Sequence, residues 1–136
     1  MGAALVMVGM NKPQWGITII KTGQYLFAAA LMGFGILHYI YNNYIITLIP
    51  TWLPAKTFLS WLVMVAFFAS AISLFIGKQV KLAMYLLSAM FFLWVLILHL
   101  PRALRENAEP EYTSLFVALG MSGMALLMKT VQKVDK

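Results

Sequence analysis

Four long apolar runs dominate the chain, and short polar or proline-containing stretches separate them. The runs lie at about residues 15–41, 58–76, 82–100 and 112–128. Lys21 is the one charged residue inside them, and it lies near the start of the first run, where its amine can reach back to the lipid headgroups. Each run is close to the roughly 20 residues that a helix needs to cross about 30 Å of hydrocarbon. The pattern therefore predicts four transmembrane helices.

Residues that are typical of helix ends bound these runs. Gly77 follows the second run, where a glycine can close a helix in the left-handed conformation. Pro101 follows the third run, which we expect to end at residue 100. The fourth run begins beside Glu109 and Glu111 and ends before Lys129, so that its flanking charges complement the helix dipole.

The stretch between the first two runs is too short and too rich in proline to cross a membrane. Pro50 and Pro54 each lack a backbone donor and disfavour a helical conformation in the preceding residue. Tyr44 and Trp52 are side chains that prefer the membrane–water interface. We therefore expect residues 42–57 to form an interfacial outer loop that partly covers the helices.

Composition leads to the same class of protein. Of the 136 residues, 62% are hydrophobic and only 10% are charged, whereas a soluble domain carries about 25% charged residues. A small domain is mostly surface, so this surface must face lipid. We predict an all-α membrane protein in which residues 1–136 form one domain, an antiparallel bundle of four transmembrane helices with an interfacial proline-containing segment after the first. Residues 1–10 are expected to form a loose or interfacial lead-in.

The charged residues divide unequally between the two sides that four spans define. The outer side carries Lys56, Arg102, Arg105, Glu106, Glu109 and Glu111, three of each sign. The side of both termini carries Asp135 and seven lysines: Lys12, Lys21, Lys78, Lys81, Lys129, Lys133 and Lys136. Because basic residues concentrate on the cytoplasmic side, both termini are expected in the cytoplasm.

Several classes of function are disfavoured by what the sequence lacks. The basic residues form no dense cluster, so a nucleic-acid partner is not expected. The absence of cysteine excludes disulfides, thiolate metal sites and iron–sulfur clusters. We find no nucleotide-binding loop, catalytic triad or paired catalytic carboxylates, and the inner halves of the spans hold no chain of ionisable groups for a proton pump.

Small residues recur at a spacing of four within the runs, as they do where helices pack closely in lipid. We expect them to be helix-packing positions, although the serines could alternatively coordinate a ligand. The predicted packing positions are Ala29, Gly33, Ala69, Ser73, Gly77, Ser114, Ala118 and Ser122.

Polar side chains from three predicted helices should converge near the outer ends of the spans. His38 and His99 lie near the outer ends of the first and third runs, and an ionisable group inside a membrane span is a functional hypothesis by default. Asn42 follows His38 by one turn, and Arg102 follows His99 by three residues. The candidate ligand-binding set is His38, Asn42, Trp52, His99, Arg102, Glu111 and Tyr112.

Three interpretations of this corner remain open. The histidines could face headgroups at the interface without any bound ligand. They could bind, with Arg102, the head group of a quinone or a similar amphipathic molecule. They could also hold a haem between opposing helices. A metal ion is not expected, because two histidines without a carboxylate inside the spans provide too few ligands for a metal site.

Five segments of the chain resemble the DoxX-like family of small bacterial membrane proteins. In order, they are GFGILHYI, IPTWLP, GKQVKLA, LHLPR and YTSLFVALGMSGMALL, and they extend over most of residues 25–128. His38 matches the family's Gly-x-x-His motif, and His99, Pro101 and Arg102 match its His-x-Pro-Arg ending. The chain departs from many members at residues 65–69, VAFFA, where they carry a glutamate in the second span.

The resemblance implies a four-helix protein of the bacterial inner membrane that is related to a subunit of an archaeal thiosulfate:quinone oxidoreductase. The expected function is a redox-associated subunit that binds a quinone at the outer corner, and whether it catalyses a reaction is left open. No group in the chain carries electrons by itself, so a redox role would require a cofactor or a partner subunit. The alternatives are a non-catalytic membrane scaffold or a lipophile-binding protein, and a bis-histidine haem protein. The lipid bilayer is the expected partner, and the small-residue faces could also serve a homo-oligomer.

Overall fold

The computed structural model describes residues 14–106 and 109–131, and every secondary-structure element in these ranges is helical. The elements are α2 (Gln14–Ile40), α3 (Asn42–Leu48), α4 (Lys56–Ile76), α5 (Val80–Trp94), the π-helical turn η2 (Val95–His99), α6 (Leu100–Glu106) and α7 (Glu109–Val131). The predicted lead-in at residues 1–10 lies outside the described residues.

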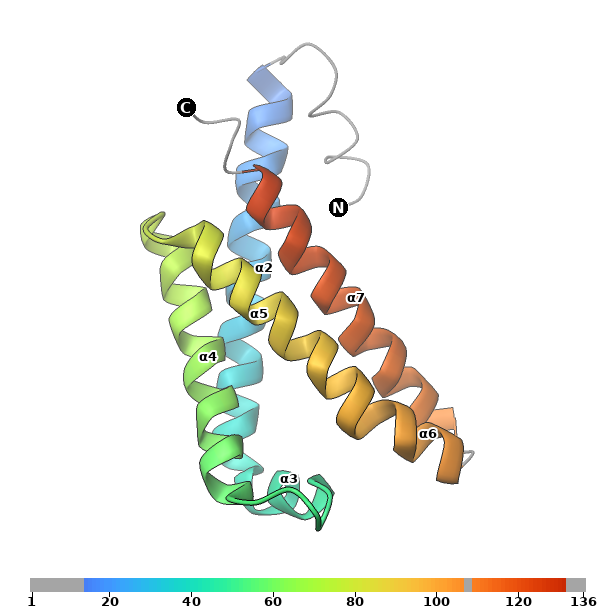
Figure 1. Ribbon diagram of the computed structural model, residues 1–136. Coiled ribbons are helices and arrows are strands. Elements are labelled where there is room, and N and C mark those ends of the chain that lie inside the picture. The colour runs from blue at the N-terminus through green and yellow to red at the C-terminus, as the bar shows by residue number, and fades with distance from the viewer. Residues whose placement is uncertain (1–13, 107–108, 132–136) are drawn as a thin grey trace.

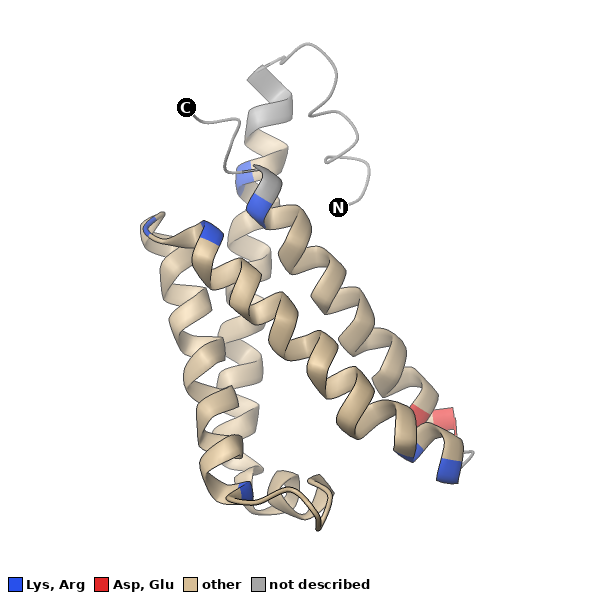
Figure 2. Cartoon of the chain, in the orientation of Figure 1, with Lys and Arg blue, Asp and Glu red and all other residues tan. Residues whose placement is uncertain are grey.

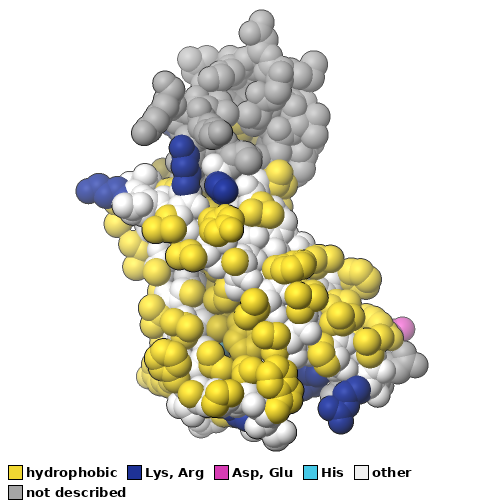
Figure 3. Space-filling view, in the orientation of Figure 1, with side chains coloured by type: hydrophobic (Ala, Val, Ile, Leu, Met, Phe, Trp, Pro, Cys, Tyr) yellow, Lys and Arg dark blue, Asp and Glu magenta, His cyan; other side chains and the backbone are white. Residues whose placement is uncertain are grey.

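The prediction of an all-helical chain with four membrane-spanning helices is confirmed at the level of length and composition. Four helical stretches are long and apolar enough to cross a bilayer: Thr18–Ile40, Lys56–Ile76, Val80–Arg105 and Glu109–Lys129. Large apolar side chains on these helices are widely exposed, and hydrophobic side chains spread over the visible face in Figure 3. An exposed apolar surface of this extent is a surface for lipid.

The long helices are arranged as two pairs (Figure 1). One pair is α2 and α4, and the other is α5 and α7. A tight turn joins α4 to α5, and there the two pairs lie close together; they diverge towards the opposite end, where α3 and α6 lie. Lysine and arginine colour only the ends of the long helices in Figure 2, and the central parts are free of charge. The molecule therefore has a closed end beside the α4–α5 turn and an open end beside α3 and α6.

Left-handed backbone conformations shape the turns at both ends of α4. Gly77 closes α4 at φ 72° and its backbone N–H donates to the carbonyl of Ser73, as expected for a glycine cap. Gln79 adopts φ 55° immediately before α5, which completes the reversal. Ala55 also has φ 55° and redirects the chain from the proline-containing segment into α4. Non-glycine residues pay a steric cost in this conformation, so these turns are tightly specified.

The stretch at residues 42–57 is not all loop. Its first part forms the short helix α3, and only the part around Pro50 and Pro54 is irregular. The third span also differs from its expected end at residue 100, because the helical run continues through Pro101 to Glu106. Pro101 lacks a backbone N–H and its ring crowds the carbonyl of Ile97. The chain accommodates it by widening the preceding turn into η2 rather than by ending the helix.

Close helix contacts use different small residues from most of those expected. Ala118 and Ser122 are buried, but Ala29, Ala69 and Ser114 are exposed. A Cβ atom added to Gly33 or Gly77 would meet nothing within 4 Å, and the hydroxyl of Ser73 donates to the Lys78 carbonyl at the end of α4.

At Gly35, α2 packs tightly against α4, because an added Cβ would lie 2.9 Å from the Phe68 ring. Ala28 on α2, Ala71 on α4 and Ala125 on α7 have no exposed surface. Small residues therefore lie at the helix contacts, as expected for helices in lipid. The fully buried ones lie near the predicted positions, on the same helices.

Candidate functional site

A cavity of about 240 Å³ lies between the two helix pairs towards the open end. Its volume is well above the roughly 30 Å³ share of one water molecule, so it has room for a ring-sized molecule. The lining is apolar except for two histidines and one serine. The lining residues are His38, Ile45, Leu48, Ile49, Ser60, Val63, Phe67, Met90, Phe91, Trp94, Leu98, His99 and Ala118.

His38 projects from the last turn of α2 into this cavity. Its ring packs edge-on against Phe67, with 5.6 Å between the ring centroids. The Nε2 atom is buried and has no hydrogen-bond partner among the described residues. A buried polar atom without a partner costs free energy, so such atoms are rare and each requires an explanation.

His99 reaches the same cavity from the opposite helix pair. It is the last residue of η2, the π-helical turn that precedes Pro101. A π-turn contains one more residue than an α-turn, which changes the direction of the side chains that follow it. The widened turn is thus the local feature that sets the direction of His99, and π-turns are frequent at functional sites.

A buried hydrogen bond closes the cavity on the side of α3. The hydroxyl of Ser60, which is 1% exposed, donates to Oδ1 of Asn42 over 2.6 Å. Asn42 is the first residue of α3 and does not itself line the cavity. Its amide therefore fixes α3 against α4 and holds this wall in place.

An ion pair ties α6 to α7 beside His99. Arg102 donates through Nε to one carboxylate oxygen of Glu111 over 3.0 Å and through one terminal nitrogen to the other over 2.7 Å. Both side chains are mostly buried, with 25% and 16% exposed surface. Two parallel hydrogen bonds of this kind fix orientation as well as distance. Tyr112, the next residue, is half-buried and does not line the cavity.

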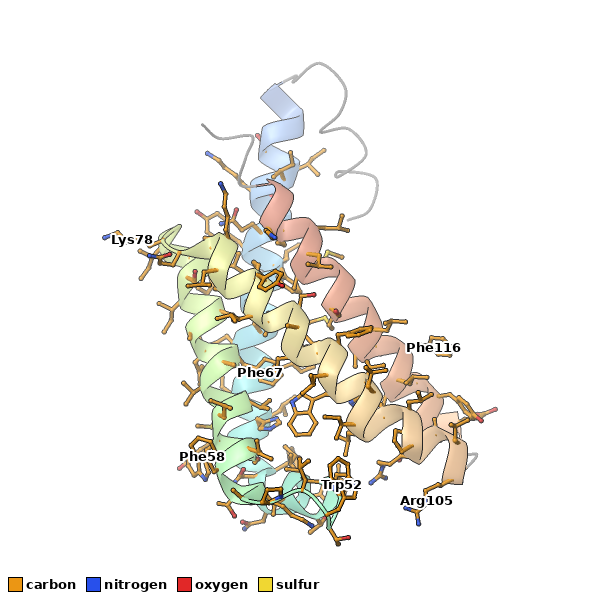
Figure 4. All side chains as sticks on the ribbon, viewed as in Figure 1. Trp52, Phe58, Phe67, Lys78, Arg105 and Phe116 are labelled. Atoms are coloured by element: carbon orange, nitrogen blue, oxygen red, sulfur yellow. The ribbon has the colours of Figure 1, made fainter. Side chains whose placement is uncertain are left out.

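Trp52 lies on a second, more open hollow of about 770 Å³ between the proline-containing segment and α6. Arg102 and Arg105 line the opposite wall of that hollow, and Leu48, Ile49 and Leu98 belong to both hollows. Trp52 and Arg105 are both at the open end in Figure 4, whereas Phe67 lies between that end and Lys78. The cavity with the histidines thus adjoins an outer hollow that carries positive charge.

The structure brings His38 and His99 together in one cavity and places the other expected residues around it. Asn42 supports the wall, Arg102 and Glu111 pair beside it, and Trp52 belongs to the outer hollow. The aromatic wall formed by Phe67, Phe91 and Trp94 was not expected from the sequence. In an apolar span nothing distinguishes such residues from lipid-facing ones.

The residues of the site limit which ligands it can hold. No group of three or more histidine, aspartate or glutamate side chains comes together in the described parts of the chain. The lining side chains that carry N–H or O–H groups are two histidines, Trp94 and Ser60, whose hydroxyl already donates to Asn42. This arrangement can bind a largely apolar molecule that carries one or two hydrogen-bonding groups.

The fold and cavity define the class as an all-helical protein with four candidate membrane spans and a partly enclosed site between two helix pairs. Comparison with known proteins places it in no family, because no family model, no curated protein and no solved structure matches the chain.

Proposed function

We propose that this chain is a multi-pass protein of the bacterial inner membrane that binds a quinone or a similar lipophilic ring molecule between His38 and His99. In this proposal the four spans form an antiparallel bundle with both termini in the cytoplasm, and the proline-containing segment lies at the outer interface. The charge distribution supports this orientation, because lysines dominate the end opposite to α3 and α6.

The observation that carries the proposal is the buried, unpartnered Nε2 atom of His38. In hydrocarbon such an atom has no water to bond, so a ligand oxygen would remove an unfavourable free energy. The Nε2 atom can donate or accept according to the imidazole tautomer. It can therefore bond to the carbonyl of an oxidised ring and to the hydroxyl of a reduced one.

The apolar lining supports an aromatic ring as the occupant. Phe67 and Phe91 lie 5.6 Å apart by ring centroids, and Trp94 lines the same space. Aromatic rings pack favourably against one another in offset or tilted arrangements. The resemblance of the motifs around His38 and His99 to DoxX-like proteins supports the same ligand class.

A redox role would depend on a partner. When bound, a quinone would supply the electron chemistry that side chains of this chain lack. The chain itself would bind and orient the ring, and it would exclude bulk water from it. We therefore propose a redox-associated binding subunit, with electrons delivered by another protein at the outer hollow.

Binding of a decyl-substituted dimethoxy-methyl-benzoquinone to protein in mild detergent tests the proposal. Because Trp94 lines the cavity, quenching of tryptophan fluorescence reports occupancy. We expect His38→Leu to weaken binding about tenfold or more, since a ligand oxygen loses its buried partner. Tyr39→Leu, which changes an exposed neighbour, is the matched control and should bind normally. His99→Ala should also abolish binding while leaving the helical circular dichroism unchanged.

Two outcomes would contradict the proposal. Unchanged affinity in both histidine variants would mean that the probe does not bind at the histidines, which would then be structural. A Soret band in the absorption spectrum of the purified protein would assign the histidines to haem instead.

A further inference from the structure

A third hollow, of about 230 Å³, lies on the far side of the cavity wall and between α2 and α7. Its lining is almost wholly apolar, and the hydroxyl of its one serine, Ser114, already donates to the carbonyl of Pro110 over 2.9 Å. The lining residues are Phe34, Phe67, Phe91, His99, Ser114, Val117, Ala118 and Met121.

This hollow shares its inner wall with the histidine cavity. Phe67, Phe91, His99 and Ala118 line both spaces. These four side chains therefore form the boundary between the two spaces. Ala118 is the smallest of the four and leaves the least material between the two spaces.

The outer rim of the hollow opens towards lipid. Phe34 is 36% exposed and Val117 is about half exposed, and both belong to candidate membrane spans. Both residues lie nearer to the middle of their spans than His38 and His99 do. A molecule held at the histidines could therefore extend towards the centre of the bilayer through this opening.

We infer that the ligand is a ring molecule with a long hydrocarbon chain, and that the chain leaves the protein through the hollow between α2 and α7. The inference rests on the proposed function and adds the class of ligand and its direction of entry. The ring would lie in the cavity of His38 and His99, where polar contacts are available. The chain would pass the wall at Ala118 and lie beside Phe34 and Val117, where only apolar contacts are available.

Such an arrangement matches the two unlike hollows that share lining residues with the cavity. The outer hollow carries Arg102 and Arg105, a surface that a hydrocarbon chain would avoid. The opening between α2 and α7 carries no charged group in its lining. A ligand with a polar ring and an apolar chain would match both ends of the site.

The test compares two probes on two variants. The probes are dimethoxy-methyl-benzoquinone without a chain and the same ring with a decyl chain, titrated at one fixed detergent concentration. Val117→Trp places a large side chain at the rim of the hollow. Leu119→Trp adds the same side chain two residues away, on an exposed position that lines neither space, and it is the matched control.

We expect Val117→Trp to weaken binding of the decyl probe about tenfold and to leave the chain-free probe unchanged. Leu119→Trp should change neither affinity. If Val117→Trp leaves the decyl probe as tightly bound as in the wild type, or weakens both probes equally, the exit route is wrong while the ring site stands. If neither probe shows saturable binding to the wild type, the ring site itself is wrong.

Discussion

The closed and open ends of the molecule both contain polar groups that bond within the protein, but they differ at one buried atom. Towards the closed end, the hydroxyls of Ser88 on α5 and Ser122 on α7 lie 3.0 Å apart, and Ser122 also lies 3.0 Å from the Ser88 carbonyl. Towards the open end, His38 lines the cavity, and its Nε2 atom is buried without a partner among the described residues. A polar group that meets its partner within the protein is explained by packing, whereas a buried one without a partner beside a cavity is a candidate for ligand binding.

Apolar packing is continuous between the two ends. Leu74 and Met84 at the closed end are at most 1% exposed, and they share one core with Phe67 and Phe91, which line the cavity. Leu98 at the open end lines the cavity and is half-buried. Because lipid is as apolar as these side chains, this core gains its stability from close packing rather than from removal of water. Each end also has a hollow, of about 520 Å³ between α4 and α5 beside their turn and of about 240 Å³ at the histidines, and Leu74 lines neither of them.

The largest expected effect on stability comes from removing packing at the closed end. We expect Leu74→Ala to lower the free energy of unfolding by about 2–4 kcal/mol, because it creates a new cavity in a filled core. Leu98→Ala removes the same atoms beside an existing cavity and should cost less than about 1 kcal/mol. Unfolding in mixed micelles with increasing dodecyl sulfate, followed by circular dichroism, measures both. Equal losses would mean that the two ends are packed alike.

The sequence was sufficient to predict the spans and the two histidines, but it was insufficient to predict the aromatic wall of the cavity at the open end. Run lengths and charge-free stretches identify the spans, because a bilayer imposes a fixed length on any helix that crosses it. His38 and His99 stand out for a similar reason, since ionisable groups are costly in hydrocarbon. The aromatic wall could not be found in this way, because Phe67 has the same pattern whether it faces a ligand, a helix or lipid.

Pro101 and the small residues show why the end of the third span and the packing faces of the helices could not be predicted from the sequence. Proline indicates a helix end, yet here the chain widens a turn and continues, since an adjacent π-turn relieves the clash. Spacing alone selected Ala29 and Gly33, but the close approach to α4 occurs at Gly35. When every face of a helix is apolar, spacing does not indicate which face meets a neighbouring helix.

An intermediate effect is expected from the ion pair that holds the open end together. Glu111→Ala leaves the Arg102 guanidinium mostly buried without its two charged hydrogen bonds. We expect a loss of about 1–2 kcal/mol in the free energy of unfolding, moderated because both side chains keep some contact with solvent or headgroups. Glu109→Ala removes an exposed carboxylate two residues earlier and should have no effect. The same unfolding titration compares them, and a loss in both variants would point to the helix dipole instead of the ion pair.

The smallest effect is expected at the satisfied polar pair of the closed end. We expect Ser122→Ala to cost only about 0.6 kcal/mol, because hydrogen bonds between helices in membranes contribute little when the unfolded state finds other partners. The double variant Ser88→Ala with Ser122→Ala should cost no more than the single ones combined, since removing both hydroxyls leaves no buried donor without a partner. Quinone affinity should stay unchanged in all three variants. A loss well above 2 kcal/mol, or a weaker affinity, would show that the serines do more than pack α5 against α7, and the contrast between the two ends would no longer hold.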